Sequence, residues 1–323
     1  MQKKYSNILL ASLALLSITA RAQETVYPAK AQKGVTVITH ATVHVGNGTV
    51  LNDASVSFEN GKITAVGTIT PAAGATVIDA TGKHVYPGFI LPSSDLGLRE
   101  ISSGVRGSND YLEIGENNAN VRSIVAYNTD SKNIGVLREN GILLAGVAPQ
   151  GELIEGSSSV VQLDAWNYED AQEVKQILLA VDLAKSFGFK LVVVGASESF
   201  QIASFLAENN VQVILDNEHS LPATEDDDVD QPYKTPAALQ KAGVVFALND
   251  IHGLDKEQAL SAITLNTAKV LGIDASTGSL EVGKDANILI ANGDALDMRG
   301  NVFTKAFIQG RDVSLDNKQR QLY

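Results

Sequence analysis

The sequence predicts an α/β protein in which a β-rich unit at each end of the chain flanks a middle of alternating strands and helices. From Gly34 to about Val85, short β-type runs alternate with turns, and β patterning returns after Thr277. Between Pro87 and Gly272, strand-like runs alternate with amphipathic helices. Because repeated β-then-α units build parallel sheets, we expect a parallel sheet in the middle and two β units that pair with each other.

Each β unit contains hairpin signals. Asn60-Gly61 separates two strand-like runs in the first unit, and Gln309-Gly310 separates two in the second. Asn-Gly between alternating hydrophobic runs is the strongest short-range hairpin signal. The strands that we expect in the two units lie at 35–38, 54–58, 62–66, 286–290, 302–308 and 311–315.

The middle segment shows continuous apolar runs, as strands buried on both faces require. A helix is predicted at 172–187, and Asp255 with Gln258 forms a capping box for a helix that ends near Leu271-Gly272. The six strand candidates of this segment lie near 85–91, 142–147, 158–163, 191–194, 211–215 and 244–248.

The first 22 residues have the pattern of a secretory signal peptide. Lys3 and Lys4 precede an apolar run at 8–18, and Ala20-Arg21-Ala22 offers a cleavage site. We therefore expect a periplasmic or extracellular protein after cleavage near Ala22, with an uncleaved anchor as the alternative. No later run reaches the roughly 18 apolar residues of a transmembrane helix, so we expect no membrane insertion.

The composition limits the partners of the chain. The net charge is −12, and loss of the first 22 residues would remove three positive charges and no negative ones, giving −15. Such a surface repels phosphate backbones and anionic lipids, so we expect no nucleic-acid partner. The chain contains no Cys, so stability must come from a hydrophobic core, for which 44% hydrophobic residues are sufficient.

Several motifs, taken in their order along the chain, carry a resemblance to a known family. They are Pro87-Gly88-Phe89, the run Thr264-Leu265-Asn266-Thr267-Ala268-Lys269, and Gly278-x-Leu280-x-x-Gly283-Lys284-x-Ala286. With the β zone before them, they resemble imidazolonepropionase-like members of the amidohydrolase superfamily. The resemblance implies a TIM-barrel-like (β/α) domain at 87–272, inserted in a composite β-sandwich built from 34–86 and 273–323. It also implies one or two divalent metals such as zinc, and hydrolysis of amide-like C–N bonds.

Two departures from the family pattern concern the barrel and its metal site. The segment 87–272 holds 186 residues, whereas such barrels typically need about 250. We therefore expect an abridged barrel, with a six-stranded open α/β sheet as the competing architecture. The family's first strand carries His-x-His, whose imidazoles point the same way and hold a metal. The matching positions here are Ser93 and Asp95, and a serine hydroxyl is a poor neutral ligand.

The remaining site candidates follow predicted strands. Asp250 follows the strand near 244–248, close to where the family keeps a catalytic Asp, and is our candidate base. His219 follows the strand near 211–215 and, with Asp95, is a weak candidate metal ligand. A turn carboxylate and a surface imidazole are the competing interpretations. We interpret His40 and His44 as structural or exposed, and His84 as a packing residue.

These observations favour two functional hypotheses. The first is a hydrolase of non-peptide or dipeptide C–N bonds that acts on a small molecule, although the missing His-x-His pair weakens the expectation of activity. The second is a catalytically silent binding or scaffold module of the bacterial envelope. A shortened form of a full-length enzyme, and a homo-oligomer, also remain open.

Overall fold

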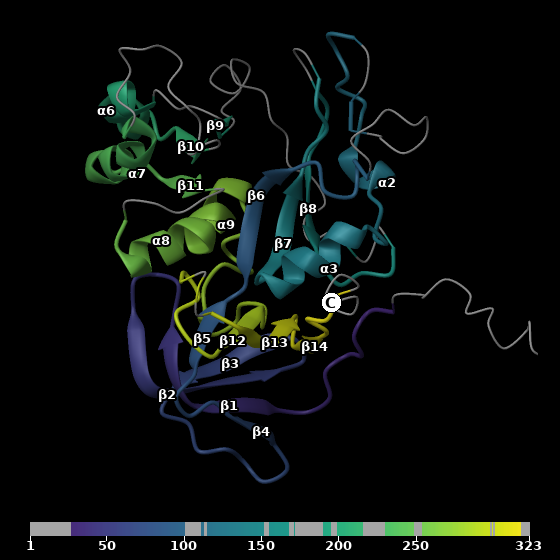
Figure 1. Ribbon diagram of the computed structural model, residues 1–323, viewed down its shortest axis with the longest axis vertical. Coiled ribbons are helices and arrows are strands. Elements are labelled where there is room, and N and C mark those ends of the chain that lie inside the picture. Colours follow the sequence, from purple (N-terminus) through teal and green to yellow (C-terminus); the bar gives the residue numbers. More distant parts are fainter. Residues whose placement is uncertain are drawn as a thin grey trace, which may run out of the picture.

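A computed structural model describes most of the chain as a large sheet with two smaller sheets and several helices beside it (Figure 1). The described residues are 27–100, 111–112, 115–151, 155–167, 171, 190–194, 199–215, 230–248, 254–297, 299 and 301–317. The predicted helix at 172–187 lies outside them. No helix among the described residues is long and apolar enough to cross a membrane.

The large sheet has eight strands, in the order β14-β13-β12-β5-β1-β2-β3, with β4 also paired to β1. The strands predicted in both end zones are all present, and β4 and β5 complete the set. Their bounds are β1 Thr36–His44, β2 Val50–Glu59, β3 Lys62–Gly67, β4 Thr76–Asp79, β5 His84–Pro87, β12 Ile288–Ala291, β13 Phe303–Ile308 and β14 Arg311–Val313.

The two ends of the chain meet where β5 pairs antiparallel with β12, with Pro87 opposite Ile288 and His84 opposite Ala291. One apolar core is formed by strands from both ends, and Phe58 of β2 packs edge-on against Phe307 of β13 at 5.1 Å between ring centroids. The described strands of both ends are thus hydrogen-bonded into a single sheet, while the domain boundaries remain predictions.

Both predicted hairpins form, and each has the required backbone. Asn60 and Gly61 have φ of 50° and 79°, and Gln309 and Gly310 have φ of 47° and 71°. Two successive positive φ values match the right-handed twist of the flanking strands. A Cβ on Gly61 would lie 2.9 Å from the carbonyl oxygen of Gln309, so the two turns touch each other.

One small sheet has the order β6-β7-β8, with bounds Phe89–Ser94, Ile142–Val147 and Ser159–Gln162. The pair β6–β7 is parallel, as predicted, but β8 runs antiparallel to β7. The expectation of a uniformly parallel sheet is therefore wrong at β8. Only 11 residues separate Val147 from Ser159, and a parallel crossover needs about a dozen or more.

The other small sheet is fully parallel, with the order β11-β10-β9 and bounds Phe246–Leu248, Gln212–Leu215 and Val192–Val194. All six strands predicted in the middle of the chain are therefore present. The helices of the structure are α2 Ser123–Ala126, α3 Lys132–Glu139, the 3-10 turn η1 Ser199–Ile202, α6 Ala203–Glu208, α7 Gln231–Ala242, α8 Lys256–Ile263 and α9 Leu265–Leu271.

Helices α8 and α9 connect the parts of the molecule, because they contact strands of both small sheets (Figure 1). The predicted cap is present: Asp255 Oδ1 accepts hydrogen bonds from the backbone N–H of Glu257 and Gln258, both at 3.1 Å. The prediction of one helix is wrong in detail, since the chain breaks at Thr264, which has φ −126° and ψ −91°. Gly272 ends α9 in the left-handed conformation, with φ 73°.

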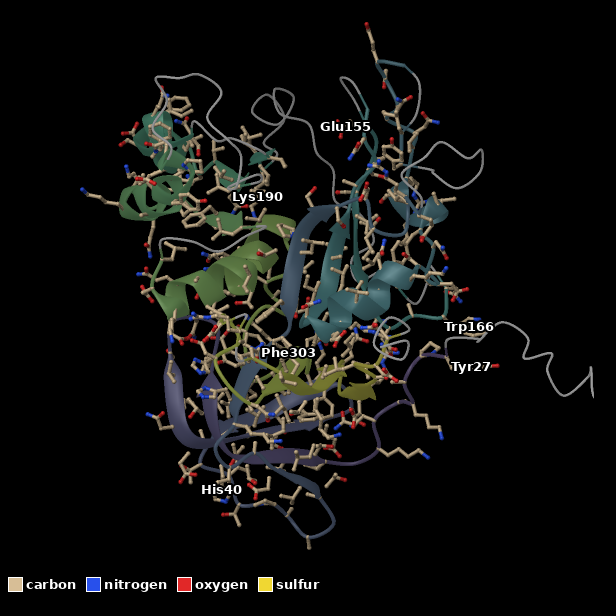
Figure 2. All side chains as sticks on the ribbon, viewed as in Figure 1. Tyr27, His40, Glu155, Trp166, Lys190 and Phe303 are labelled. Atoms are coloured by element: carbon tan, nitrogen blue, oxygen red, sulfur yellow. The ribbon has the colours of Figure 1, made fainter. Side chains whose placement is uncertain are left out.

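The small sheets also pack on the large one. Phe89 of β6 meets Phe303 of β13 edge-on at 5.7 Å between centroids, and Figure 2 labels Phe303 in the middle of the molecule. Within the described residues the six middle strands form two separate sheets, and they form neither a closed barrel nor one open sheet. The architecture is mixed α/β, and the abridged barrel remains a prediction.

Candidate functional site

A cavity of about 40 Å³ lies where the two small sheets face each other. Its walls come from the carboxyl-terminal parts of β6, β9 and β10, from β7, β8 and the loops beside them, and from α9. Apolar side chains predominate, and the polar ones are three serines. The lining residues are Pro92, Ser93, Gly146, Ala148, Ser158, Ser159, Val160, Val192, Val194, Ile214, Val270 and Leu271.

The structure separates the two residues that occupy the family's His-x-His positions. Ser93, in β6, lines the cavity. Asp95 follows the end of β6 and is absent from the cavity wall; its Oδ2 lies 3.7 Å from the Arg99 guanidinium. Ser94 donates a hydrogen bond to the carbonyl oxygen of Gly146 at 2.9 Å, which joins β6 to the end of β7.

The other two predicted site residues, His219 and Asp250, lie outside the described residues. β10 ends at Leu215 and β11 at Leu248, and both are parallel to β9, whose Val194 lines the cavity. The carboxyl ends of these strands therefore lie at one edge of the sheet. His219 and Asp250 follow that edge by four and two residues.

The described residues do not fit a divalent metal at this cavity. Such a site needs several converging imidazoles or carboxylates. Among the described residues, no group of three or more such side chains is placed to hold a metal ion. The cavity itself offers neutral serine hydroxyls, and Asp95 is engaged by Arg99.

A second cluster of polar side chains lies between the large sheet and α8, and it includes residues that we interpreted as structural. His44 of β1 and Glu257 of α8 form a hydrogen bond of 2.6 Å, and His44 Nε2 lies 3.0 Å from His84 Nδ1 of β5. Tyr86 stacks on His44 at 4.4 Å. His44 and His84 contact each other because their strands pair side by side.

Predicting this cluster from the sequence would have required knowing that β1 pairs with β5. In that register Thr42 lies opposite His84 and Val43 opposite Val85, which brings the end of β1 beside the start of β5. Glu257 is 213 residues away from His44, and nothing in the local sequence of either residue indicates the contact.

Comparisons with known proteins agree with the fold. A family model described as "Amidohydrolase family" matches residues 233–313. Two imidazolonepropionases are similar in sequence: that of Thermoplasma volcanium is 28% identical over 131 residues, which is 40% of this chain, and that of Bacillus cereus 31% over 151 residues, which is 44%. The crystal structure of an amidohydrolase from Thermotoga maritima superposes with a TM-score of 0.76 and 20% identity, covering 86% of this chain and 99% of that one.

Together these similarities support the amidohydrolase superfamily, with imidazolonepropionase-like members, as the group that this chain resembles. The matched regions amount to 27% of the Thermoplasma imidazolonepropionase and 34% of the Bacillus one, so this chain spans about a third of the relatives that it matches. The family match begins in α7 and ends at β14. It includes two of the motifs that first suggested the resemblance, the run Thr264–Lys269 at α9 and the segment Gly278–Ala286 before β12.

Proposed function

We propose that this protein acts on amide-like C–N bonds of a small molecule, at the cavity between the two small sheets. Resemblance to the superfamily supports the reaction class, and both relatives similar in sequence are imidazolonepropionases. The location of the active site at this cavity is supported by its lining residues, several of which come from the carboxyl-terminal parts of β6, β9 and β10. That edge of the strands holds the active site in essentially all characterised barrels of the TIM type.

The residues of the chain allow some roles at this cavity to be assigned. The cavity of about 40 Å³ is too small to enclose a dipeptide or lactam, so apolar side chains of β9, β10 and α9 would contact only one end of the substrate. Ser93 would donate a hydrogen bond to a substrate carbonyl. Asp250, two residues after β11, is the proposed general base, and His219 the proposed second polar group. The described residues around this cavity do not fit a divalent metal.

The experiment uses the full chain and two measurements. Bound zinc, manganese and iron are quantified by mass spectrometry, and hydrolysis of dipeptides and lactams is followed with and without added metal. We expect turnover that falls 10²-fold or more in Asp250→Asn, the range for loss of a general base. The control Asp53→Asn removes an equal charge at an exposed site and should retain full activity. Absence of turnover in every condition would refute the proposal.

A second candidate function, a catalytically silent binding module, is favoured by one observation. Ser93 occupies the cavity where the family has an imidazole, and the rest of the wall is predominantly apolar. Such a protein would bind the same small amides without turnover. Saturable binding of a lactam by calorimetry, unchanged in Asp250→Asn and unaccompanied by product, would support this candidate against the first.

We also propose that the protein is exported, on the strength of the basic start, the apolar run and the Ala20-Arg21-Ala22 site. Expression of the full chain in a bacterium, followed by fractionation and N-terminal sequencing, tests this. We expect a mature form in the periplasm or medium that starts at Gln23. An unprocessed chain in the cytoplasm would contradict it.

A further inference from the structure

A cavity of about 120 Å³ lies between β1, β5, the first half of α8 and the segment after β12. It has an aromatic wall of His44, His84 and Tyr86, and two leucines, Leu260 and Leu296, complete its apolar surface. From these surroundings we propose that the cavity binds a small organic cation with N–H donors, of the primary alkylammonium type. The proposal does not depend on the C–N hydrolysis assigned to the other cavity.

The hydrogen bonds between the rings leave one imidazole nitrogen free to accept. A carboxylate only accepts hydrogen bonds, so His44 Nδ1–H donates to Glu257 Oε1 at 2.6 Å. In the tautomer of His44 that carries no proton on Nε2, this nitrogen accepts a hydrogen bond from His84 Nδ1 at 3.0 Å. This arrangement leaves His84 Nε2 with a lone pair and, within the described residues, no protein partner. The charge of Glu257 polarises the chain of bonds and strengthens that acceptor.

Burial and the neighbouring His44 lower the pKa of His84, which keeps this acceptor neutral near pH 7. The pKa of Tyr86 is raised to about 12, mainly by burial, so its ring carries an uncharged phenol. Tyr86 OH accepts a hydrogen bond from the backbone N–H of Ala295 at 3.2 Å and keeps its own proton for a ligand.

The charges around the cavity favour a cation. Lys256 and Asp294 form an ion pair of 2.5 Å and offset each other. Its hydrogen bond to Asp294 raises the pKa of Lys256. Burial, the largest single cause, acts to raise the pKa of Asp294, but the contacts with Lys256 and the backbone N–H of Leu296 together lower it. Glu257 adds a second carboxylate to the lining, against the single ammonium group of Lys256. Its Oε2 is also buried and has no hydrogen-bond partner in the structure, so an N–H donor from a ligand would satisfy it.

The shape and aromatic wall complete the argument. His44 and Tyr86 are nearly parallel at 4.4 Å between ring centroids, and His84 and Tyr86 at 6.0 Å, so the three rings form a stacked aromatic wall beside the ligand. A dry cavity of roughly 150 Å³ holds a benzene molecule, so this one takes a ligand of about six heavy atoms or fewer. Leu260 and Leu296 would pack against its alkyl part.

The test is titration calorimetry of the full chain with n-propylammonium, with neutral n-propanol and with tetramethylammonium, which has no N–H donor. We expect n-propylammonium to bind at least tenfold more tightly than the other two. Glu257→Gln should weaken its binding at least tenfold. Asp53→Asn should leave it unchanged, because Asp53 forms a similar carboxylate–imidazole pair with His40, at 2.9 Å, but on an exposed site. Figure 2 labels His40 at the end of the molecule away from α6 and α7.

A measurement on the unaltered protein guards against a variant that fails to fold. In the ¹⁵N NMR spectrum of the imidazoles, n-propylammonium should shift the His84 signals and leave those of His40 in place. Its affinity should also fall as the pH is lowered and His84 takes up a proton. Equal loss in both variants, equal binding of n-propanol, or no shift at His84 would each overturn the proposal.

Discussion

Asp164 is the residue whose replacement we expect to be most costly among the charged groups. It follows β8, and 4% of its side chain is exposed. Its carboxylate lies 3.2 Å from the Arg138 guanidinium of α3 and 3.5 Å from that of Arg311 in β14, and it accepts a hydrogen bond from the backbone N–H of Ala29. This one carboxylate therefore holds together the N-terminal segment, α3 and the edge of the large sheet.

The magnitude follows from burial. Asp164→Asn keeps the shape but removes the charge, which leaves two largely buried guanidinium groups without it; the side chains of Arg138 and Arg311 are 10% and 17% exposed. Burial already lowers the pKa of Arg138, and Asp164 acts against that shift. Removing one partner of a buried ion pair costs about 3–5 kcal/mol. At roughly 2–4 °C per kcal/mol for a large domain, Tm should fall by about 6–20 °C.

Urea unfolding and differential scanning calorimetry of the purified chain measure both quantities. Asp53→Asn is the matched control, because its side chain is 79% exposed and exposed pairs contribute at most about 1 kcal/mol. A loss below about 1 kcal/mol in Asp164→Asn, or a loss equal to that of the control, would show that this cluster does not hold the segments together.

Three further predictions concern a cap, the core and pH. Asp255→Ala removes the acceptor of two backbone N–H groups at the start of α8 and should cost about 1 kcal/mol in urea unfolding; an unchanged midpoint would contradict the cap. Leu143→Ala leaves a cavity at a fully buried position of β7 and should lower the free energy of unfolding by about 2–5 kcal/mol. A loss under 1 kcal/mol would mean that neighbouring side chains fill the cavity. Because burial lowers the pKa of His84, the unfolded chain binds more protons below its ordinary pKa of about 6.5. Stability should therefore decline as the pH falls through that value, and the decline should be shallower in His84→Gln; identical pH profiles would refute this.

Features with a short-range cause could be predicted from the sequence. Asn60-Gly61 and Gln309-Gly310 fix their hairpins because few residues tolerate two positive φ values in succession. Asp255 caps α8 through hydrogen bonds to residues two and three positions away. All six middle strands were recognisable as apolar runs, because buried strands lack a polar face.

Features that depend on contacts between residues far apart in the chain could not be predicted from the sequence. The direction of β8 depends on the length of its connection to β7 rather than on its own residues. The cluster of His44, His84 and Glu257 exists only because β1 pairs with β5 and α8 packs across both strands. At the candidate site, the motif Pro87-Gly88-Phe89 indicated the position of Ser93 in the strand that lines the cavity. Asp250 and His219 remain predictions from their order in the chain.

The pairing of β5 with β12 has a consequence for biosynthesis. Pro87 and Ile288 are opposite each other although 200 residues separate them, so one side of β5 has no partner until the ribosome has made most of the polypeptide. Contacts this remote slow folding, and an unpaired strand edge attracts other chains. A nascent chain therefore needs protection from aggregation until its final strands emerge.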